Sequence, residues 1–378
     1  QPYIEGAFMT KHGGKYYLQY ACPGTQYNTY ADGVYVGESP LGPFTRQAAN
    51  PFSAVTGGFL TGAGHGSTIA DRYGNYWHAA TMRISVNHDF ERRVGLFPAG
   101  FDKDGVLYCN QNFASYPHRI PAGRFDPADW QPEWMLLSCG KAAFASSTAA
   151  GSDPSLAVDE NIRTWWSAAD AALGQWLTVD LGRVMDVHAV QVNLADQDIA
   201  LDLPPEAYGD DRHTRHIELE PQISHYAIEA STDGEHWAQL VSVARECSNG
   251  YYEVENGVAA RYVRLVGGQL PYGQVLRVSG LRVFGRGGGA KPAPAQASAQ
   301  RRGCLDAIVC WQPLAAMGAQ GVNIRYGIAP DKLYLSHLVY GASEAALTTL
   351  TAGQTYYIAV DSFNENGVTP GPVFALQA

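Results

Sequence analysis

The chain has 378 residues, which suggests two or three domains, and its hydrophobic content of 46% is enough to form buried cores. Its 41 glycines, 22 tyrosines and 8 tryptophans favour strand-rich modules over helical ones. The formal net charge of −10 and the lack of a long Lys/Arg run exclude a typical nucleic-acid surface, and no apolar run of about 18 residues is present that would cross a membrane.

Short segments of alternating polar and apolar residues dominate the first 140 residues. We predict strands at 15–20, 33–37, 76–80 and 94–97, separated by turns at 31–33, 39–43, 72–75 and 103–105. Strands at this spacing, without helical interruption, predict an all-β architecture, which leaves a propeller, a barrel or a sandwich open.

One carboxylate lies at the very start of this pattern. Glu5 precedes Gly6, and a Gly-Gly turn at 13–14 follows before an aromatic strand. We expect this order to hold a carboxylic acid at the end of a strand, facing a pocket, with a hairpin behind it. A solvated carboxylate at a strand end is the alternative.

Four motifs carry a resemblance over residues 1–125. They are Glu5-Gly6, the stretch 29–36 with the turn Ser39-Pro40-Leu41-Gly42-Pro43, the glycine-rich segment 62–67, and the stretch 71–78. Together they resemble glycoside hydrolase family 43, whose members are five-bladed β-propeller enzymes. The resemblance implies that residues 1–138 are the C-terminal part of such a propeller.

The resemblance implies an inverting hydrolase, in which one carboxylic acid protonates the leaving oxygen and a distant carboxylate activates water. Glu5 matches the acid, which needs a raised pKa. Ala7 replaces the proline that usually follows Glu-Gly in the family. No residue here matches the family's base aspartate or the aspartate that tunes the acid, and Asp32 is explained by a turn at 31–33.

Because Glu5 is so near residue 1, we expect the blades that carry those two aspartates to lie upstream. We therefore expect this polypeptide alone to be inactive, and its first module to be poorly soluble because strand edges stay unpaired.

Two further residues are assigned to the first module by the resemblance. His65 lies between glycines and matches the histidine at the propeller centre, which is associated with a bound ion, and Arg83 is assigned to the same centre or to substrate. The alternatives are a histidine satisfied within a tight turn and an exposed surface arginine.

The second module extends from 139 to 286. Its segments 154–167, 174–182, 226–237, 260–265 and 283–285 resemble the coagulation-factor discoidin domain, also called carbohydrate-binding module family 32, a β-sandwich of the jelly-roll type. The alternation at 175–181 predicts a half-buried strand, and 231–234 predicts a hairpin turn. We expect Trp166, Trp176 and Trp237 in the core.

The loop from Asp159 to Thr164 matches the structural calcium loop of that family. The resemblance implies a structural Ca²⁺ with Asp159, Asn161 and Thr164 as oxygen ligands. Gly280 lies near the place where the family often has a glutamate.

Sugar contacts in this fold come from loops. Candidates for stacking on a sugar are Trp165, Tyr251 and Tyr272. An inserted stretch at 196–222, with Asp210-Asp211-Arg212-His213 and His216, is expected to be an exposed loop.

Residues 287–294 are rich in glycine and proline and predict a linker. Residues 295–378 resemble a fibronectin type III domain, with Trp311 in the core and Tyr356 as the tyrosine-corner residue. We expect a spacer without chemistry. Cys304 and Cys310 are predicted on one strand, where their separation prevents a disulfide between them.

The function predicted from these modules is a secreted, periplasmic or cell-surface glycosidase, exo- or endo-acting on a polysaccharide such as arabinan, xylan or galactan. Its partner is carbohydrate, with no nucleic acid and no membrane span, and we expect a monomer. The alternative is a non-catalytic glycan-binding or adhesion protein.

Overall fold

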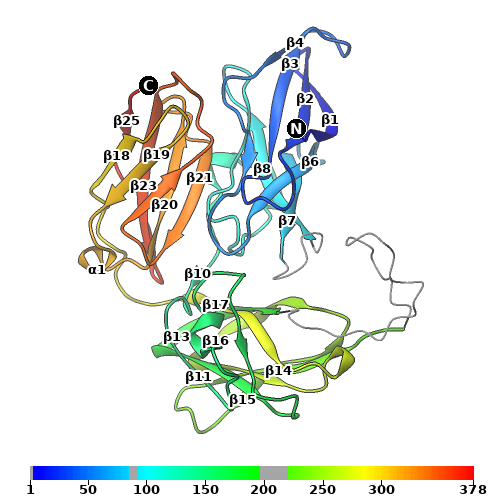
Figure 1. Ribbon diagram of the computed structural model, residues 1–378, viewed down its shortest axis with the longest axis vertical. Helices are drawn as coiled ribbons and strands as arrows, with labels where there is room; N and C mark the ends of the chain where they lie inside the picture. Colours follow the sequence, from blue (N-terminus) through cyan, green and yellow to red (C-terminus); the bar gives the residue numbers. More distant parts are fainter. Residues whose placement is uncertain (1–2, 85–91, 196–219) are drawn as a thin grey trace. The chain divides into compact units, whose positions relative to one another are not determined.

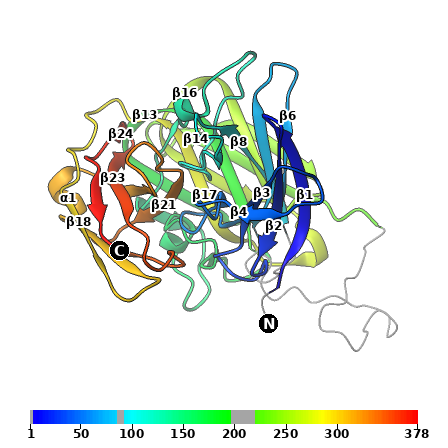
Figure 2. The same ribbon diagram turned by 90° about the horizontal axis from the view of Figure 1, so that it is seen from above.

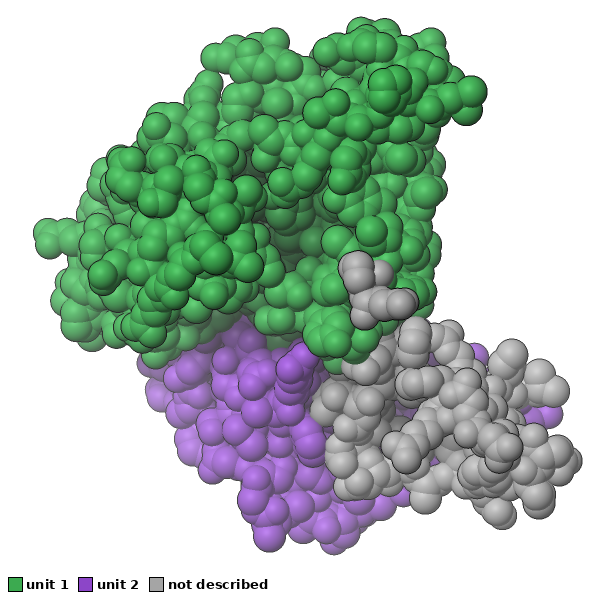
Figure 3. Space-filling view, turned by 45° about the horizontal axis from the view of Figure 1, so that its top comes forward, with its two compact units in different colours: residues 1–84, 88–135, 288–378 green, residues 85–87, 136–287 purple. Residues whose placement is uncertain are grey.

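The computed structural model describes residues 3–84, 92–195 and 220–378 and divides into two compact units. The first unit combines residues 1–84, 88–135 and 288–378, and the second comprises 85–87 and 136–287, as coloured in Figure 3. Strands dominate the described residues, beside short 3-10 turns and one four-residue α-helix, α1 (Leu314–Met317). The all-β prediction is confirmed. In the described part, no helix is both long and apolar enough to cross a membrane.

The N-terminal part of the first unit consists of two antiparallel meanders, coloured blue to cyan in Figure 1. The first has the order β1-β2-β3-β4 with β5 beside β3, and the second has the order β6-β7-β8-β9. Such up-and-down sheets are the building units of propeller blades. The strands are β1 (Glu5–His12), β2 (Lys15–Cys22), β3 (Ala31–Gly37), β4 (Phe44–Arg46), β5 (Ser53–Ala54), β6 (Gly62–Ala70), β7 (Tyr76–Arg83), β8 (Arg92–Phe101) and β9 (Leu107–Cys109).

A shared core joins the two meanders, and β6 packs against β1, β2 and β3, which lie side by side in Figure 2. Tyr17, Val34 and Phe52 from the first meander are buried with Met82 and Phe97 from the second. The four strands predicted in this region lie within β2, β3, β7 and β8, so these predictions are confirmed. The number of blades stays a prediction.

The predicted turn at 31–33 is wrong, because these residues belong to β3, where Asp32 is paired with Ala21 of β2. Gly33 has a different role in this strand. A Cβ atom at Gly33 would lie 2.6 Å from the ring of Tyr20, so the missing side chain makes room for a neighbouring aromatic ring.

The second unit contains an eight-stranded sheet with the order β10-β17-β13-β16-β14-β15, with β11 beside β13 and β12 beside β17. Its core includes Trp166, Leu177, Val190, Ile228 and Leu281. The predicted strand at 175–181 and the hairpin turn with Gly234 at φ +82° are confirmed. The strands are β10 (Met135–Leu136), β11 (Ala142–Ala145), β12 (Trp166–Ser167), β13 (Trp176–Leu194), β14 (Ser224–Ser231), β15 (Ala238–Arg245), β16 (Asn249–Gly267) and β17 (Arg277–Arg286).

Only one of the three tryptophans expected in the core is fully buried. Trp166 is 0% exposed, whereas Trp176 and Trp237 are half-buried. The Arg264 guanidinium lies 3.8 Å from the centre of the Trp237 ring, and the Trp237 indole N–H donates to the Gly234 carbonyl. Trp237 is thus covered by a cation rather than by the core.

The C-terminal part of the first unit is built from two sheets, β18-β19-β22 and β21-β20-β23-β24, with β25 beside β23. Trp311 is buried in their shared core, and the Tyr356 hydroxyl accepts a hydrogen bond of 3.1 Å from the Thr351 backbone N–H, which is tyrosine-corner geometry. The strands are β18 (Ala297–Arg301), β19 (Ala307–Trp311), β20 (Gly321–Gly327), β21 (Leu335–Tyr340), β22 (Glu344–Leu347), β23 (Tyr356–Asn364), β24 (Gly367–Thr369) and β25 (Phe374–Leu376).

The fibronectin type III assignment stays a prediction. The prediction that Cys304 and Cys310 lie on one strand is wrong, because Cys304 lies before β19 and only Cys310 is on it. All six cysteines are free.

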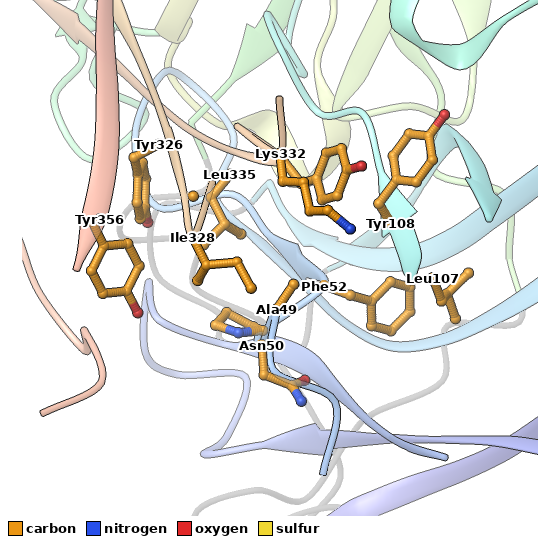
Figure 4. Close-up of a pocket in the computed structure, with 13 residues that line it drawn as sticks. Ala49, Asn50, Phe52, Leu107, Tyr108, Tyr326, Ile328, Lys332, Leu335 and Tyr356 are labelled. Atoms are coloured by element: carbon orange, nitrogen blue, oxygen red, sulfur yellow. The ribbon is translucent and has the colours of Figure 1, made fainter. Parts of the chain in front are cut away.

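The C-terminal sheets pack directly on the meanders, which contradicts the expectation of a spacer. Lys332 Nζ lies 2.6 Å from Asp102 Oδ2 and 2.7 Å from Asp104 Oδ2, and the rings of Tyr334 and Tyr108 stack at 4.4 Å. The cavity in Figure 4 lies at this junction, between Phe52 and Leu107 on one side and residues 326–335 on the other. Its volume of about 10 Å³ is too small for a ligand, so the two surfaces are closely packed around this cavity.

Candidate functional site

Glu5, the predicted acid, lies at the first residue of β1 within a cluster of polar side chains. The Tyr30 hydroxyl donates to Oε1 at 3.0 Å, and the Tyr3 hydroxyl donates to Oε2 at 3.1 Å. His65 Nδ1 lies 3.4 Å from Oε1. The side chain of Glu5 is 28% exposed, so the carboxylate is held by the protein and still accessible to a ligand.

The surroundings of Glu5 favour its charged form. Burial raises the pKa of the carboxyl, but the hydrogen bonds from Tyr30 and Tyr3 and the nearby His65 outweigh it, so the pKa of Glu5 lies below its usual value. The raised pKa expected for a general acid is therefore not found with the groups that the structure contains.

His65 and Glu5 meet because the backbone is irregular at both residues. The register of β1 with β2 shifts between Glu5 and Phe8, and that of β6 with β7 shifts between Gly64 and Ser67. His65 has φ +54°, in the left-handed region that a non-glycine residue seldom adopts. Bulges next to active sites redirect side chains, and strained residues concentrate at such sites.

Glycines let the partners approach Glu5. Gly6 has φ +64°, and a Cβ atom there would lie 2.8 Å from the His65 ring. A Cβ atom at Gly64 would lie 2.9 Å from the Tyr30 ring. Gly6 and Gly64 therefore allow aromatic rings to contact the backbone closely around the carboxylate of Glu5.

Asp32 was assigned no role from the sequence, but it is a buried part of this site. It is 1% exposed, and its Oδ1 and Oδ2 accept from the backbone N–H groups of His65 and Gly66, each at 2.8 Å. The alternation of β3 could have indicated that its side chain points inward, but the Asp-Gly pair favoured a turn.

A buried polar chain continues behind Asp32. His78 Nε2 lies 3.1 Å from Asp32 Oδ2, although the two are not aligned for a hydrogen bond. Thr68 Oγ1 lies 3.0 Å from His78 Nδ1 and donates to Gln19 Oε1, and Gln19 donates to Thr10 Oγ1 on β1. From Asp32 to Thr10 this chain connects five strands of the two meanders, and only the long-range pairing of strands could reveal it.

Arg83 ends β7, where its guanidinium donates to the Gln26 carbonyl at 2.8 Å. That contact fixes the segment leading to Tyr30. Arg92, opposite Arg83 in the register of β7 and β8, is close enough to Tyr30 to act on it electrostatically. The assignment of Arg83 and His65 to a propeller centre stays a prediction.

The predicted sugar-binding residues lie on the second unit. Trp165 is half-buried, whereas Tyr251 and Tyr272 are 41% and 43% exposed. Trp166 of β12 is paired with Val278 of β17, and Val278 is also paired with Leu194, the last residue of β13. Gly250 of β16 is paired with Val192, two residues away on β13. Trp165 and Tyr251 adjoin Trp166 and Gly250 in sequence and therefore belong to the same end of the sheet. A common sugar platform with Tyr272 stays a prediction.

The predicted calcium ligands form a closed loop. Asp159 Oδ1 accepts from the Asn161 N–H at 2.9 Å, and its Oδ2 accepts from the Thr164 hydroxyl at 2.7 Å. Burial raises the pKa of Asp159, so a cation beside it would relieve the cost of its charge. The described residues contain no cluster of three or more His, Cys, Asp or Glu side chains suited to a metal. The oxygen donors fit Ca²⁺ in type, with one carboxylate among them.

The neighbouring Glu160 has a separate role, which the sequence did not reveal. With φ +60°, its carboxylate turns inward and forms a bidentate ion pair with Arg282, at 2.9 and 2.8 Å. The side chains are 2% and 1% exposed. Arg282 also donates to Gln191, which ties the loop to β13 and β17.

Of the insertion predicted at 196–222, residues 196–219 lie outside the described residues. The stretch 85–91 also lies outside them. Asp210, Asp211, Arg212, His213 and His216 therefore keep only their sequence-based interpretation.

Two family models match parts of the chain. Residues 1–107 match the model for glycosyl hydrolases family 43, and residues 156–265 match the model for a NedA-like, galactose-binding domain. The chain thus has a glycosidase-like N-terminal part and a discoidin-like domain of a carbohydrate-binding type. None of the curated proteins searched matches the chain.

Several solved structures are similar to it. A glycoside hydrolase is 19% identical with a TM-score of 0.39, and the match covers 75% of this chain but only 60% of the other. Chitosan-binding module 1 from the chitosanase/glucanase of Paenibacillus sp. IK-5 is 23% identical with a TM-score of 0.30, covering 40% of this chain and 99% of the module. The CBM32 of AlyQ, solved with 4,5-unsaturated mannuronic acid, is 21% identical with a TM-score of 0.30, covering 40% and 98%.

Proposed function

We propose that this chain belongs to an inverting glycoside hydrolase in which Glu5 is the general acid and the second unit binds glycan. The observation that supports this most strongly is the placement of Glu5 at the irregular start of β1, held by Tyr30 and Tyr3 and facing His65, within the region that matches family 43.

The proposed mechanism needs a protonated Glu5. The carboxylic acid gives its proton to the glycosidic oxygen as the bond breaks, while a separate carboxylate activates water on the opposite face of the sugar. The base is assigned to no residue of this chain. Because the pKa of Glu5 is lowered by its present neighbours, the mechanism requires additional negative charge near it, which would raise the pKa by repulsion.

Glycan binding is proposed for the second unit, through Trp165, Tyr251 and Tyr272. Aromatic rings offer an apolar face to a sugar ring and keep polar groups at their edge. The substrate class is a polysaccharide such as arabinan, xylan or galactan, cleaved in exo or endo fashion. Because related modules were solved with chitotriose or with a mannuronic acid derivative, a binding panel should include amino sugars and uronic acids.

We further propose a structural Ca²⁺ held by Asp159, Asn161 and Thr164, which would stabilise the loop without entering the reaction. A fibronectin type III fold for residues 295–378, secretion to a cell-surface or periplasmic site, and a monomeric state complete the proposal.

A panel of aryl glycosides tests the proposal, with the natural gene product that carries this sequence and its Glu5→Gln variant. We expect hydrolysis by the wild type of at least one arabinoside, xyloside or galactoside, with inversion at the anomeric carbon, and severe loss in the variant. Hydrolysis unaffected by Glu5→Gln would exclude the proposed acid.

A non-catalytic glycan-binding protein is the second candidate. The lowered pKa of Glu5 favours it, because a carboxylate that is charged at neutral pH cannot donate a proton. Glycan binding without turnover of any glycoside in the panel would support this candidate.

A further inference from the structure

We propose that Asp32 is the positioning residue of the Glu5 site, because its carboxylate holds the bulge that presents His65 to Glu5. This inference deepens the proposed function and rests on it for the role of Glu5, whereas the hold of Asp32 on His65 can be tested without any activity.

The bulge leaves two backbone N–H groups that need an acceptor. Pairing between β6 and β7 is interrupted between Gly64 and Ser67, so His65 and Gly66 have no partner residue on β7. Both N–H groups donate to Asp32, one to each carboxylate oxygen, at 2.8 Å. A single side chain thus supplies the acceptors that the strand ladder lacks, which buried N–H groups require.

Asp32 is too deeply buried to be an incidental surface residue. It is 1% exposed and belongs to β3, the strand that begins just after Tyr30. A buried carboxylate is costly unless it is hydrogen-bonded or paired, and the two N–H groups of the bulge provide the hydrogen bonds. The bulge and the carboxylate therefore stabilise each other, since Asp32 supplies acceptors for the two N–H groups and these N–H groups supply hydrogen bonds to the buried carboxylate.

The same bulge controls two of the three side-chain contacts of Glu5, those with His65 and Tyr30. His65, held by Asp32, reaches Oε1 at 3.4 Å, and the Tyr30 ring lies against the backbone of Gly64 while its hydroxyl donates to Oε1. Gly66 has no room for a Cβ atom because His78 lies against it. A displaced bulge would consequently move His65 away from Glu5 and weaken the packing of the Tyr30 ring against Gly64.

Several titratable or charged groups face Glu5 and Asp32, and all of them are retained when the pKa of Glu5 is compared between the wild type and the variants. They are Tyr3, Tyr30, His65 on β6, His78 on β7, Cys22 on β2, Cys109 on β9 and Arg92 on β8.

The first test is the titration of Glu5 by carbon-13 NMR of glutamate-labelled protein, with the resonance assigned through Glu5→Gln. In Asp32→Asn one backbone N–H faces an amide NH₂ instead of an acceptor, so the bulge is released and His65 moves away. We expect the pKa of Glu5 to shift upward, because the nearby His65 lowers it in the wild type. An unchanged titration of Glu5 in folded Asp32→Asn would overturn the proposal.

Asp71→Asn is the matched control. Asp71 also accepts from two backbone N–H groups, those of Tyr73 and Asn75, and from the Trp77 indole, but in a turn that does not touch Glu5. We expect this variant to leave the titration of Glu5 unchanged. A shift equal to that in Asp32→Asn would show that the effect is general loosening of the fold, and would contradict the proposal.

The kinetic test uses the natural gene product. We expect kcat/KM to fall about 10- to 100-fold in Asp32→Asn, because the loss of positioning around Glu5 outweighs the gain from a more readily protonated acid, with the limb of the pH profile that depends on Glu5 displaced upward. We expect kcat/KM to stay near the wild-type value in Asp71→Asn. If no glycoside is hydrolysed by the wild type, the proposed function fails, while the NMR titration still decides the role of Asp32.

Amide hydrogen exchange of the wild type covers the case in which Asp32→Asn does not fold. We expect the His65 and Gly66 amides to exchange as slowly as the paired amides of β7, although they lack strand partners. Rapid exchange at both positions would show that Asp32 does not hold them and would overturn the proposal.

Discussion

At the scale of single residues, the N-terminal site is organised around one carboxylate and its donors. Tyr30, Tyr3 and His65 lower the pKa of Glu5 against the effect of burial. A carboxyl group whose pKa is lowered by folding stabilises the fold above its unfolded pKa of about 4.3, and this contribution is lost as the pH falls.

Replacing Tyr30 by phenylalanine tests this balance. The change removes the 3.0 Å hydrogen bond to Oε1, so we expect a higher pKa of Glu5 and a stability gap to the wild type that narrows as the pH falls below about 4.3. Urea denaturation at a series of pH values measures the gap. Tyr27→Phe, at a side chain that is 52% exposed, is the control and should show no such trend. A gap independent of pH would contradict the expectation.

Glu5 and His65 could be selected from the sequence because each lies beside glycine within a recognisable motif. The alternation of β3 could at most have indicated that Asp32 points inward, whereas the partners of Asp32 and Tyr30 depend on the pairing of β2 with β3 and on the contact of β3 with β6. The Asp-Gly pair favoured a turn on local grounds, but pairing with Tyr20 and Ala21 of β2 places both residues in a strand.

At the scale of elements, side-chain contacts tie loop residues to strands in the second and third predicted modules. The pair Glu160–Arg282 joins a loop to β17, and the Tyr356 hydroxyl joins β23 to the segment before it. Strands were predictable from alternation, whereas the inward turn of Glu160 was not, because Asp159 and Asn161 in the same loop favoured a metal-binding interpretation of its acidic residues.

Breaking the buried pair should be costly. We expect Glu160→Gln to destabilise the second unit by about 3–5 kcal/mol, because Arg282 would remain buried without its counter-charge. Calorimetry of the full chain measures the loss. Lys15→Ala, which removes a partner of an exposed pair with Glu38, should change stability by less than about 1 kcal/mol. Equal effects of the two variants would contradict this assignment.

The tyrosine corner makes a smaller contribution. Tyr356→Phe leaves the Thr351 N–H without its acceptor, so we expect a loss of about 1–2 kcal/mol in the first unit by denaturant unfolding. Tyr357→Phe, at the next and less buried position, is the control. A larger loss in the control than in Tyr356→Phe would contradict the corner assignment.

At the scale of the whole molecule, the C-terminal sheets are part of the first compact unit rather than a spacer. Residues 331–334 bring one lysine, one aspartate and one tyrosine against the turn at 102–104 and against Tyr108. The linker prediction for 287–294 rests on composition and stays a prediction, and composition carries no information about docking between surfaces far apart in sequence.

Lys332→Met tests this docking. Lys332 and Asp102 are each 11% exposed, so we expect the unpaired Asp102 to destabilise the first unit by about 1–3 kcal/mol, measured by calorimetry. Lys103→Met, which removes the exposed contact with Asp331, should cost less than about 1 kcal/mol. An unaffected transition in Lys332→Met would show that this contact does not stabilise the junction.

The role of Glu5 as general acid is tested most directly by the leaving-group dependence of Glu5→Gln in the natural gene product. For glycosides with a poor leaving group, such as a natural oligosaccharide, we predict a fall in kcat/KM of about 10²- to 10⁴-fold, because departure of the oxygen requires its proton. For a dinitrophenyl glycoside, which needs no protonation to depart, we predict a much smaller fall. Equal losses on both substrates, or no loss on either, would contradict the assignment of Glu5 as the acid.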